Sequence, residues 1–194
     1  MKSVTTLSIL FFLTTLFSLP SMGQNTTPEG FTSGSVTLAN GTVLNGFVKE
    51  QFRKKASICF IPEAGAKKKT YDGWELASAK INTQEYLCVK GDFFTVLASG
   101  ELYFLQKNSG APGKITYNGT EPVLMGTTEG KPGDYFIYNS KTLAINLVDK
   151  ATYETVVNTT MGNYQPAVDK ANETREDVAR LKSAVELYNQ RPAK

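Results

Sequence analysis

VTLANGTVLNGFV, residues 36–48, consists of two short stretches of alternating apolar and polar residues joined at Asn40-Gly41. An Asn-Gly pair between such stretches predicts a β-hairpin, because both residues tolerate the positive φ of a tight turn. Alternate residues of a strand face the same side of a sheet, so one face of this hairpin is expected to be buried. The folded part of the chain is therefore predicted to open with a hairpin.

This hairpin has two possible registers, which differ in the side chains that share a face. With a two-residue turn, one face carries Val36, Leu38, Val43 and Phe47. With a three-residue turn and a glycine bulge, the shared face carries Val36, Leu38, Leu44 and Val48, around Gly46. A slip of one residue exchanges the two faces, so the sequence leaves both registers open. In either register, Gly46 indicates a bend or a close approach of another backbone.

Strand-like stretches continue to about residue 149 and are separated by turns rich in Gly, Pro and Asn. They are ASICFIP (56–62), EYLCVKG (85–91), DFFTVLASGELYFLQKN (92–108), ITYNG (115–119), PVLMG (122–126), DYFIYN (134–139) and TLAINLV (142–148). Many short strands at this spacing predict an antiparallel sheet, sandwich or barrel-like, rather than βαβ units. Adjacent aromatic residues such as Phe93 and Phe94 point to opposite faces, which favours a sheet covered on both sides over one with an exposed aromatic row.

Helical patterns begin after this β-rich part. Residues 149–162 fit a short helix or an additional strand. Val178, Leu181, Val185 and Tyr188 then recur at spacings of three and four, which predicts an amphipathic helix of about four turns. Thr174 and Asp177 approximate its capping box, and it ends near Arg191-Pro192. We expect this helix to cover one face of the sheet, with a role as a partner helix as the alternative.

The fold class predicted is α+β and mainly β. The chain divides into a signal peptide (1–23), a flexible lead-in (24–33), a β-rich domain (34–149) and a helical segment packed on that domain (150–191).

The signal peptide is predicted from MKSVTTLSILFFLTTLFSLPSMGQ. Lys2 precedes an apolar run from Leu7 to Leu19, and small residues follow, with cleavage expected between Gly23 and Gln24. A retained membrane anchor is the alternative. We expect a secreted protein located in the periplasm, at the cell surface or outside the cell.

The two cysteines, Cys59 and Cys88, both lie in strand-like stretches. Export makes a disulfide between them possible, provided that their strands are close neighbours. Two unpaired thiols in the interior are the alternative.

The chain has no histidine. Ser-His-Asp and Cys-His mechanisms therefore have no general base, and most catalytic zinc sites lack a ligand. The sequence contains no phosphate-binding or dinucleotide-binding glycine motif, and no cofactor or metal is predicted. Paired carboxylates, as in glycoside hydrolases, remain possible. Acidic residues near predicted strand ends are Glu75, Glu85, Asp92, Glu101, Glu121 and Asp134, and their spacing singles out no pair.

Aromatic and basic residues give the remaining candidates for binding. Tyr71 and Trp74 flank a turn at Asp72-Gly73, where exposed rings would stack on sugars or on a protein. Two basic clusters bracket ASICFIP: Arg53, Lys54 and Lys55 precede it, and Lys67, Lys68 and Lys69 follow it. They fit an anionic glycan or lipid headgroup, or else lysines that protect a sheet edge. The formal net charge of +3 is too small to indicate nucleic-acid binding.

GSVTLANGTVLNGFVKE, YDGWELASAKI, GELYFLQ and the tail AVELYNQ together resemble an uncharacterised family of short secreted β-rich proteins from Gram-negative bacteria. The resemblance rests on turns and strand patterning and implies no activity. We therefore expect an exported, non-enzymatic binding or structural module of the cell envelope or extracellular space, with an unknown partner that could be a glycan. The alternative is a carbohydrate-active or glycan-binding protein, which would require two facing carboxylates in a groove beside exposed aromatic rings.

Overall fold

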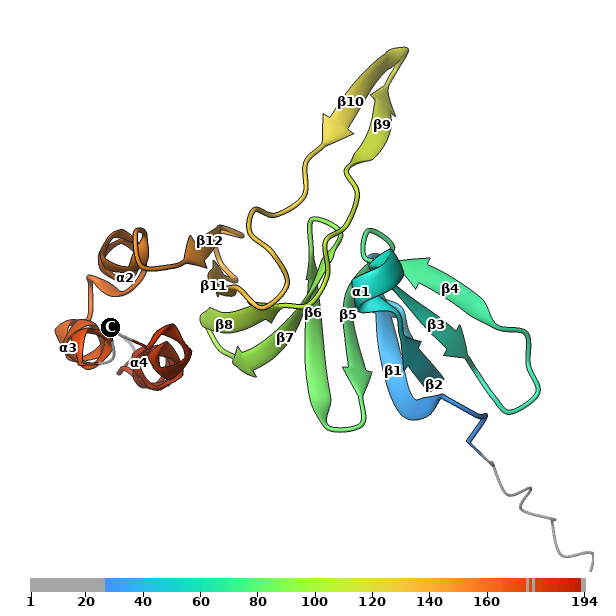
Figure 1. The fold of residues 1–194 in the computed structure, drawn as a ribbon, viewed down its shortest axis with the longest axis horizontal. Helices are drawn as coiled ribbons and strands as arrows, with labels where there is room; N and C mark the ends of the chain where they lie inside the picture. Colours follow the sequence, from blue (N-terminus) through green and yellow to red (C-terminus); the bar gives the residue numbers. More distant parts are fainter. Residues whose placement is uncertain (1–26, 174, 176, 193–194) are drawn as a thin grey trace, which may run out of the picture.

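The computed structural model describes residues 27–173, 175 and 177–192. Within this part, ten strands form one antiparallel sheet in the order β12-β11-β8-β7-β6-β5-β1-β2-β3-β4, and β9 and β10 pair only with each other (Figure 1). The strands are β1 (Thr32–Leu38), β2 (Val43–Glu50), β3 (Ser57–Ile61), β4 (Lys69–Asp72), β5 (Leu76–Ile81), β6 (Gln84–Val89), β7 (Asp92–Ala98), β8 (Leu102–Lys107), β9 (Lys114–Asn118), β10 (Glu121–Met125), β11 (Tyr135–Asn139) and β12 (Ile145–Val148).

The helices are α1 (Phe52–Lys55), α2 (Tyr153–Met161), α3 (Gln165–Asn172) and α4 (Lys182–Asn189), with a 3-10 turn at Val178–Leu181. The C-terminal helices pack against the sheet, so the predicted fold class is confirmed. The predicted signal peptide, its cleavage site at Gly23-Gln24 and Thr174 lie outside the described residues. None of the helices in the described ranges is long and apolar enough to cross a membrane.

The opening hairpin adopts the three-residue turn with a glycine bulge. The amide of Leu38 donates to the Thr42 carbonyl, the amide of Gly41 donates to the Leu38 carbonyl, and Gly41 has a φ of 86°. Val36 lies opposite Leu44, and the side chain of Val48 packs in the same core cluster. A side chain at Gly46 would collide with the carbonyl of Ile61, so this glycine allows a close backbone approach.

The N-terminal half of the sheet packs its inner face around α1. Phe52 is the buried residue of this short helix, and its ring lies 4.6 Å from the ring of Phe93 and 4.9 Å from that of Tyr86, centroid to centroid. Val36, Ile58 and their neighbours complete this core. Burial of a side chain the size of Phe52 stabilises the fold by roughly 1.5–3 kcal/mol.

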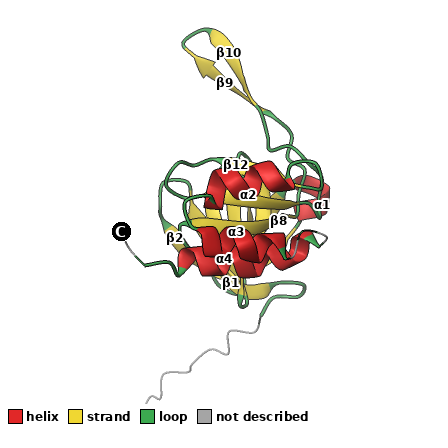
Figure 2. Ribbon diagram, turned by 90° about the vertical axis from the view of Figure 1, so that its left-hand side faces the viewer, coloured by secondary structure: helices red, strands yellow, loops and turns green. Residues whose placement is uncertain are grey.

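The C-terminal helices cover the same face of the other half of the sheet (Figure 2). The predicted single helix is divided into the 3-10 turn and α4, but Leu181, Val185 and Tyr188 are buried against the strands as their spacing predicts. Asp177 caps the 3-10 turn, because its carboxylate accepts a hydrogen bond from the amide of Ala179. The segment that could have been a helix or a strand is α2.

On the opposite face of this half, the core of the described residues contains no helical residue. Phe94, Leu105 and Phe136 form its core and are at most 2% exposed. The segment between β10 and β11 covers part of this core, and its Gly130 lies against Phe136. Both faces of β7 are therefore buried, since Phe93 belongs to the core on one side and Phe94 to the core on the other.

Candidate functional site

The β9–β10 hairpin projects from the body of the molecule, and we call residues 114–125 the arm (Figure 1). Its strands are joined by a two-residue turn, Gly119-Thr120, and Gly119 at the first turn position supplies the positive φ (66°) that such a tight hairpin turn needs. Almost every residue of the arm is exposed. An isolated two-stranded hairpin is only marginally stable in water, and among the described residues neither strand of the arm pairs with a strand of the body.

The two faces of the arm differ in chemistry. In the observed register Leu124 lies opposite Ile115, and Pro122 lies opposite Tyr117, so these four residues share one face. The exposed fractions of Ile115, Tyr117 and Leu124 are 60%, 72% and 71%. The other face alternates Lys114, Thr116, Asn118 and Glu121 with Val123 and Met125. The arm therefore presents an apolar face that the described part of the chain leaves uncovered.

A buried ion pair anchors the base of the arm. Lys107 Nζ lies 3.1 Å from Asp92 Oδ2, and both side chains are at most 2% exposed. Lys107 also donates hydrogen bonds to the carbonyls of Thr128, Glu129 and Gly130 at 2.9–3.2 Å. These three carbonyls belong to the segment that leads from β10 back to the sheet, so the ammonium group binds one of the two segments that connect the arm to the body.

Asp92 binds both of the segments that connect the arm to the body. Its carboxylate accepts hydrogen bonds from Ser109 Oγ at 3.1 Å and from the amide of Ala111 at 2.7 Å, in the segment that leads to β9. It also accepts from Thr128 Oγ1 at 2.6 Å, in the returning segment. Removing two charges from water is costly unless further hydrogen bonds satisfy them, and this pair is surrounded by such bonds. The pair therefore fixes where the arm leaves the sheet.

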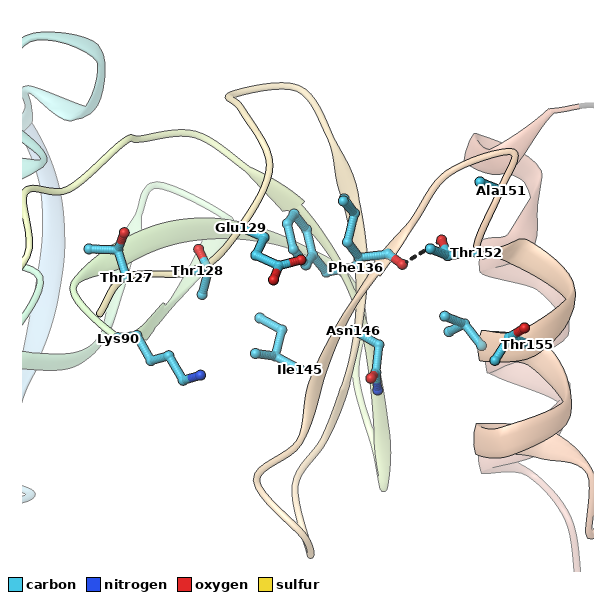
Figure 3. A pocket seen from close by; sticks show the side chains of 12 residues that line it. Lys90, Thr127, Thr128, Glu129, Phe136, Ile145, Asn146, Ala151, Thr152 and Thr155 are labelled. Carbon is cyan, nitrogen blue, oxygen red and sulfur yellow. Dashed lines mark hydrogen bonds between the residues drawn. The ribbon is translucent and has the colours of Figure 1, made fainter. Parts of the chain in front are cut away.

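A pocket of about 520 Å³ lies beside the base of the arm, between the returning segment, the β11–β12 hairpin and α2 (Figure 3). Lys90 and Glu129 are its charged residues, and Thr127, Thr128 and Thr155 line it as well, although the Thr128 hydroxyl donates to Asp92. Thr152 closes one side, with its hydroxyl donating to the Leu147 carbonyl at 2.8 Å. The mixture of single charges and scattered hydroxyls gives no converging set of groups for one ligand.

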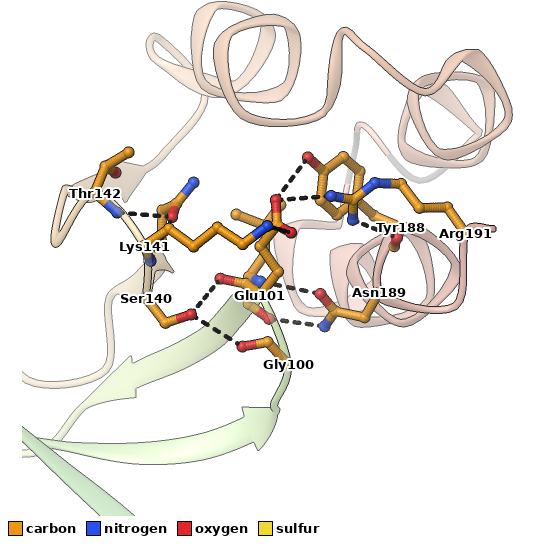
Figure 4. A network of polar contacts seen from close by, with 10 residues as sticks. Gly100, Glu101, Ser140, Lys141, Thr142, Tyr188, Asn189 and Arg191 are labelled. Atoms are coloured by element: carbon orange, nitrogen blue, oxygen red, sulfur yellow. Dashed lines mark hydrogen bonds and ion pairs between the residues drawn. The ribbon is translucent and has the colours of Figure 1, made fainter. Parts of the chain in front are cut away.

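A second polar cluster joins the C-terminus of α4 to the sheet (Figure 4). The Glu101 carboxylate pairs with Lys141 and with Arg191, the latter at 2.7 Å. These contacts, led by the hydrogen bond from Lys141, hold the pKa of Glu101 below its usual value. A cavity of about 650 Å³ adjoins the cluster. The negative charge of Glu101 is already balanced by Lys141 and Arg191. The cluster attaches α4 to the sheet, and Glu101 acts there as an ion-pair partner rather than as a free acid.

Asn189 also attaches α4 to the sheet, through hydrogen bonds to the backbone. Its Oδ1 accepts from the amide of Leu102 at 2.9 Å, and its Nδ2 donates to the carbonyls of Leu102 at 2.8 Å and Ser99 at 3.2 Å. The side chain thus pairs with β8 as a neighbouring strand would. Gly100, at a φ of 154°, lies against the amide group of Asn189, where a side chain would not fit.

The other acidic candidates are dispersed. Asp92 is buried in its ion pair, Glu121 is at the tip of the arm, and Asp134 accepts from the amide of Lys131 in a turn. Glu75 accepts from the amide of Asp72, while Glu85 lines a shallow pocket on β6. Five pockets of the described residues each contain one carboxylate, so none of these five has the pair that glycoside hydrolysis uses.

The aromatic pair proposed for ligand stacking is not an exposed platform. Tyr71 is 4% exposed and packs in the core with Phe60, so its ring cannot contact a ligand. Trp74 is half-buried, and its indole covers Gly91, where a side chain would collide with the ring. The Trp74 indole N–H is buried and has no hydrogen-bond partner among the described residues. Both side chains thus serve mainly to pack this end of the sheet.

The two basic clusters do not merge into one patch. Arg53, Lys54 and Lys55 are exposed on α1, which precedes β3, whereas Lys69 pairs with Phe60 near the end of β3. Lys69 begins β4, and β4 is an edge strand of the sheet. Lysines at a sheet edge discourage pairing with another sheet, which is the second of the two interpretations offered by the sequence.

The possible disulfide is not formed. Cys59 in β3 and Cys88 in β6 are both free thiols. Strands β5, β1 and β2 lie between them in the sheet, so their backbones are much farther apart than a disulfide permits. Burial raises the pKa of the Cys88 thiol above its usual value, which makes it an unreactive interior group.

Sequence reasoning recognised both strands of the arm but placed them within the β-rich body. The Gly- and Pro-containing segments that flank them, SGAPG and GTTEGKPG, are the signal that they leave it. Comparisons with protein-family models, curated proteins and solved structures found no match to this chain.

Proposed function

We propose that this protein is an exported, non-enzymatic interaction module that binds its partner through the apolar face of the arm. The observation that carries this proposal is the exposure of Ile115, Tyr117 and Leu124 on a projection rooted in a buried ion pair. Contiguous apolar side chains exposed on a soluble protein mark interaction surfaces, and an aromatic ring among them is the usual energetic centre.

Export is part of the proposal and rests on the sequence of residues 1–23. The resemblance to short secreted proteins of Gram-negative bacteria, which rests on turns and strand patterning in the rest of the chain, agrees with it. Glycan binding receives less support, because the Tyr71–Trp74 pair is largely buried and the pockets lack paired carboxylates. A protein surface suits the arm better than a sugar, since its apolar face combines aliphatic side chains with one aromatic ring.

Site-specific photo-crosslinking in the expressing cells tests this function. A photoreactive amino acid placed at Tyr117 is expected to give a discrete protein adduct. Val43 and Leu143 are matched controls, because they are also exposed large apolar residues, at 56% and 67%, but lie on the body. Adducts of equal yield at all three positions, or none at Tyr117, would contradict the proposal.

A further inference from the structure

The two outer edges of the arm are chemically different. In a two-residue hairpin the residues that flank the turn exchange hydrogen bonds, and this pattern alternates along the strands. Asn118 and Glu121 flank the turn here, so the backbone groups of Ile115 and Tyr117 on β9, and of Pro122 and Leu124 on β10, point outward. Neither strand has a second sheet partner among the described residues.

Pro122 closes the β10 edge. Proline has no N–H, so this edge lacks a donor where an added strand would need one. The β9 edge has no such protection, because Ile115 and Tyr117 both offer an N–H and a carbonyl to an incoming strand. The arm therefore carries one open and one blocked edge, which limits how many strands can be added.

We propose that β9 pairs antiparallel with β9 of a second copy of this chain, about a twofold axis at Thr116. This proposal goes beyond the proposed function, because it concerns the edge of β9 and leaves the apolar face of the arm available to the partner proposed above. Pairing of this kind places Ile115 opposite Tyr117 of the second copy and Thr116 opposite itself. β-Branched residues opposite aromatic ones, and Thr opposite Thr, are favourable pairs across strands.

Charge and shape agree with this register. Lys114 lies opposite Asn118 of the second copy. Within that copy, Asn118 lies opposite Glu121. The Lys114 ammonium group and the Glu121 carboxylate of the second copy therefore lie in one row across the strands, on the same face. Like charges do not face each other. On the other face, Ile115, Tyr117, Pro122 and Leu124 of both copies form one apolar surface that continues across the new strand pair.

The blocked edge explains why such pairing would stop at two copies. An isologous contact through β9 uses the open edge of each protomer, and Pro122 ends the resulting four-stranded sheet on both sides. A lipid surface is a poorer partner, because the tip of the arm is polar: it reads Asn118-Gly119-Thr120-Glu121. Two five-residue strands make a small interface, so we expect a weak, reversible dimer.

Disulfide trapping tests the register directly. In the proposed pairing, Thr116 and its copy form a non-hydrogen-bonded pair with Cα atoms about 4.5 Å apart, which suits a disulfide. We expect Thr116→Cys to give a covalent dimer under mild oxidation. Val123→Cys is the matched control: it is opposite Thr116 on the same face of the arm, but its copy would be three strand spacings away, about 14 Å. Equal trapping of both variants would overturn the proposal.

Sedimentation equilibrium of the purified protein gives the second test. Ile115→Pro removes an outward N–H while leaving the ladder within the hairpin intact, and we expect it to weaken the dimer at least about tenfold. Pro122→Val opens the blocked edge and should produce assemblies larger than a dimer. A protein that stays monomeric up to about 1 mM and resists trapping at Thr116 would refute self-pairing. Adducts of the arm with a different protein would then still support the proposed function.

Discussion

The sheet and the arm are built from the same kinds of residue and use them in opposite ways. In the sheet, Leu102, Phe104 and Leu105 are completely buried by helices, loops and neighbouring strands. In the arm, Ile115, Tyr117 and Leu124 are all at least 60% exposed. Burial of a large apolar side chain contributes about 1.5–3 kcal/mol to folding, a contribution that the arm largely forgoes. Residues kept in this state contribute little to the stability of the monomer, which is why we assign them to binding.

The ion pair between Asp92 and Lys107 connects these two regions, and its loss has the largest expected effect. Asp92→Asn leaves the Lys107 ammonium buried without a counterion, which should lower the free energy of unfolding by about 3–5 kcal/mol in a urea titration. The double variant Asp92→Asn with Lys107→Met removes both charges and is expected to be more stable than Asp92→Asn alone. Equal stability of the single variant and the wild type would contradict the assignment of a stabilising role to this buried pair.

A matched pair of leucines measures the contrast itself. Leu105 is 0% exposed and Leu124 is 71% exposed, and both lie in strands. We expect Leu105→Ala to lower the free energy of unfolding by about 2–5 kcal/mol and Leu124→Ala to change it by less than about 0.5 kcal/mol. Chemical denaturation followed by circular dichroism provides both numbers. A large loss for Leu124→Ala would place the arm within the cooperative core.

Much of the sheet was predictable because its strands carry strong local signals. Asn-Gly turns, Gly-Asp breaks and dense aromatic stretches located the opening hairpin, β7, β8, β11 and β12. β4 and β5 were not predicted. β4 begins with the last of three consecutive lysines, and LASAKI in β5 has small and polar residues where a strong strand pattern has large apolar ones. Both strands form because β3 and β1 offer them hydrogen-bonding edges, which is information that a local pattern does not contain.

The candidate site was less predictable for a related reason. The strand patterns of β9 and β10 predict a hairpin equally well inside a sheet and outside it. Pairing of Asp92 with Lys107 depends on the alignment of β7 with β8, and the bulge between Val96 and Ala98 shifts that alignment. Tyr71 and Trp74 looked exposed because they flank a turn, yet Tyr71 lies opposite the buried Ile58 of β3 and shares its core. Exposure is a property of the whole fold, so residue type alone could not separate these aromatics from Tyr117.

Asn189 offers a smaller test, at the junction between the body and its last helix. Asn189→Ala removes three hydrogen bonds to the backbone of Ser99 and Leu102. We expect the free energy of unfolding to fall by about 1–3 kcal/mol, because the freed groups of the strand are partly buried. The same variant should leave disulfide trapping through Thr116→Cys unchanged. A parallel loss of trapping would mean that the arm and the helical junction are coupled.

The smallest expected effect is a dependence of stability on pH through Glu101, which lies on the body and not on the arm. Lys141 and Arg191 lower its pKa in the folded state, so its ionised form stabilises the fold. This contribution is complete above the pKa of Glu in the unfolded chain, about 4.3, and is lost as the pH falls through the lower folded value. Thermal unfolding of the wild type should therefore lose more stability between pH 7 and pH 3 than that of Glu101→Gln. Lys141→Met, which removes the first of the two cations, should lie between them, whereas parallel curves for all three proteins would exclude Glu101 as a source of acid sensitivity.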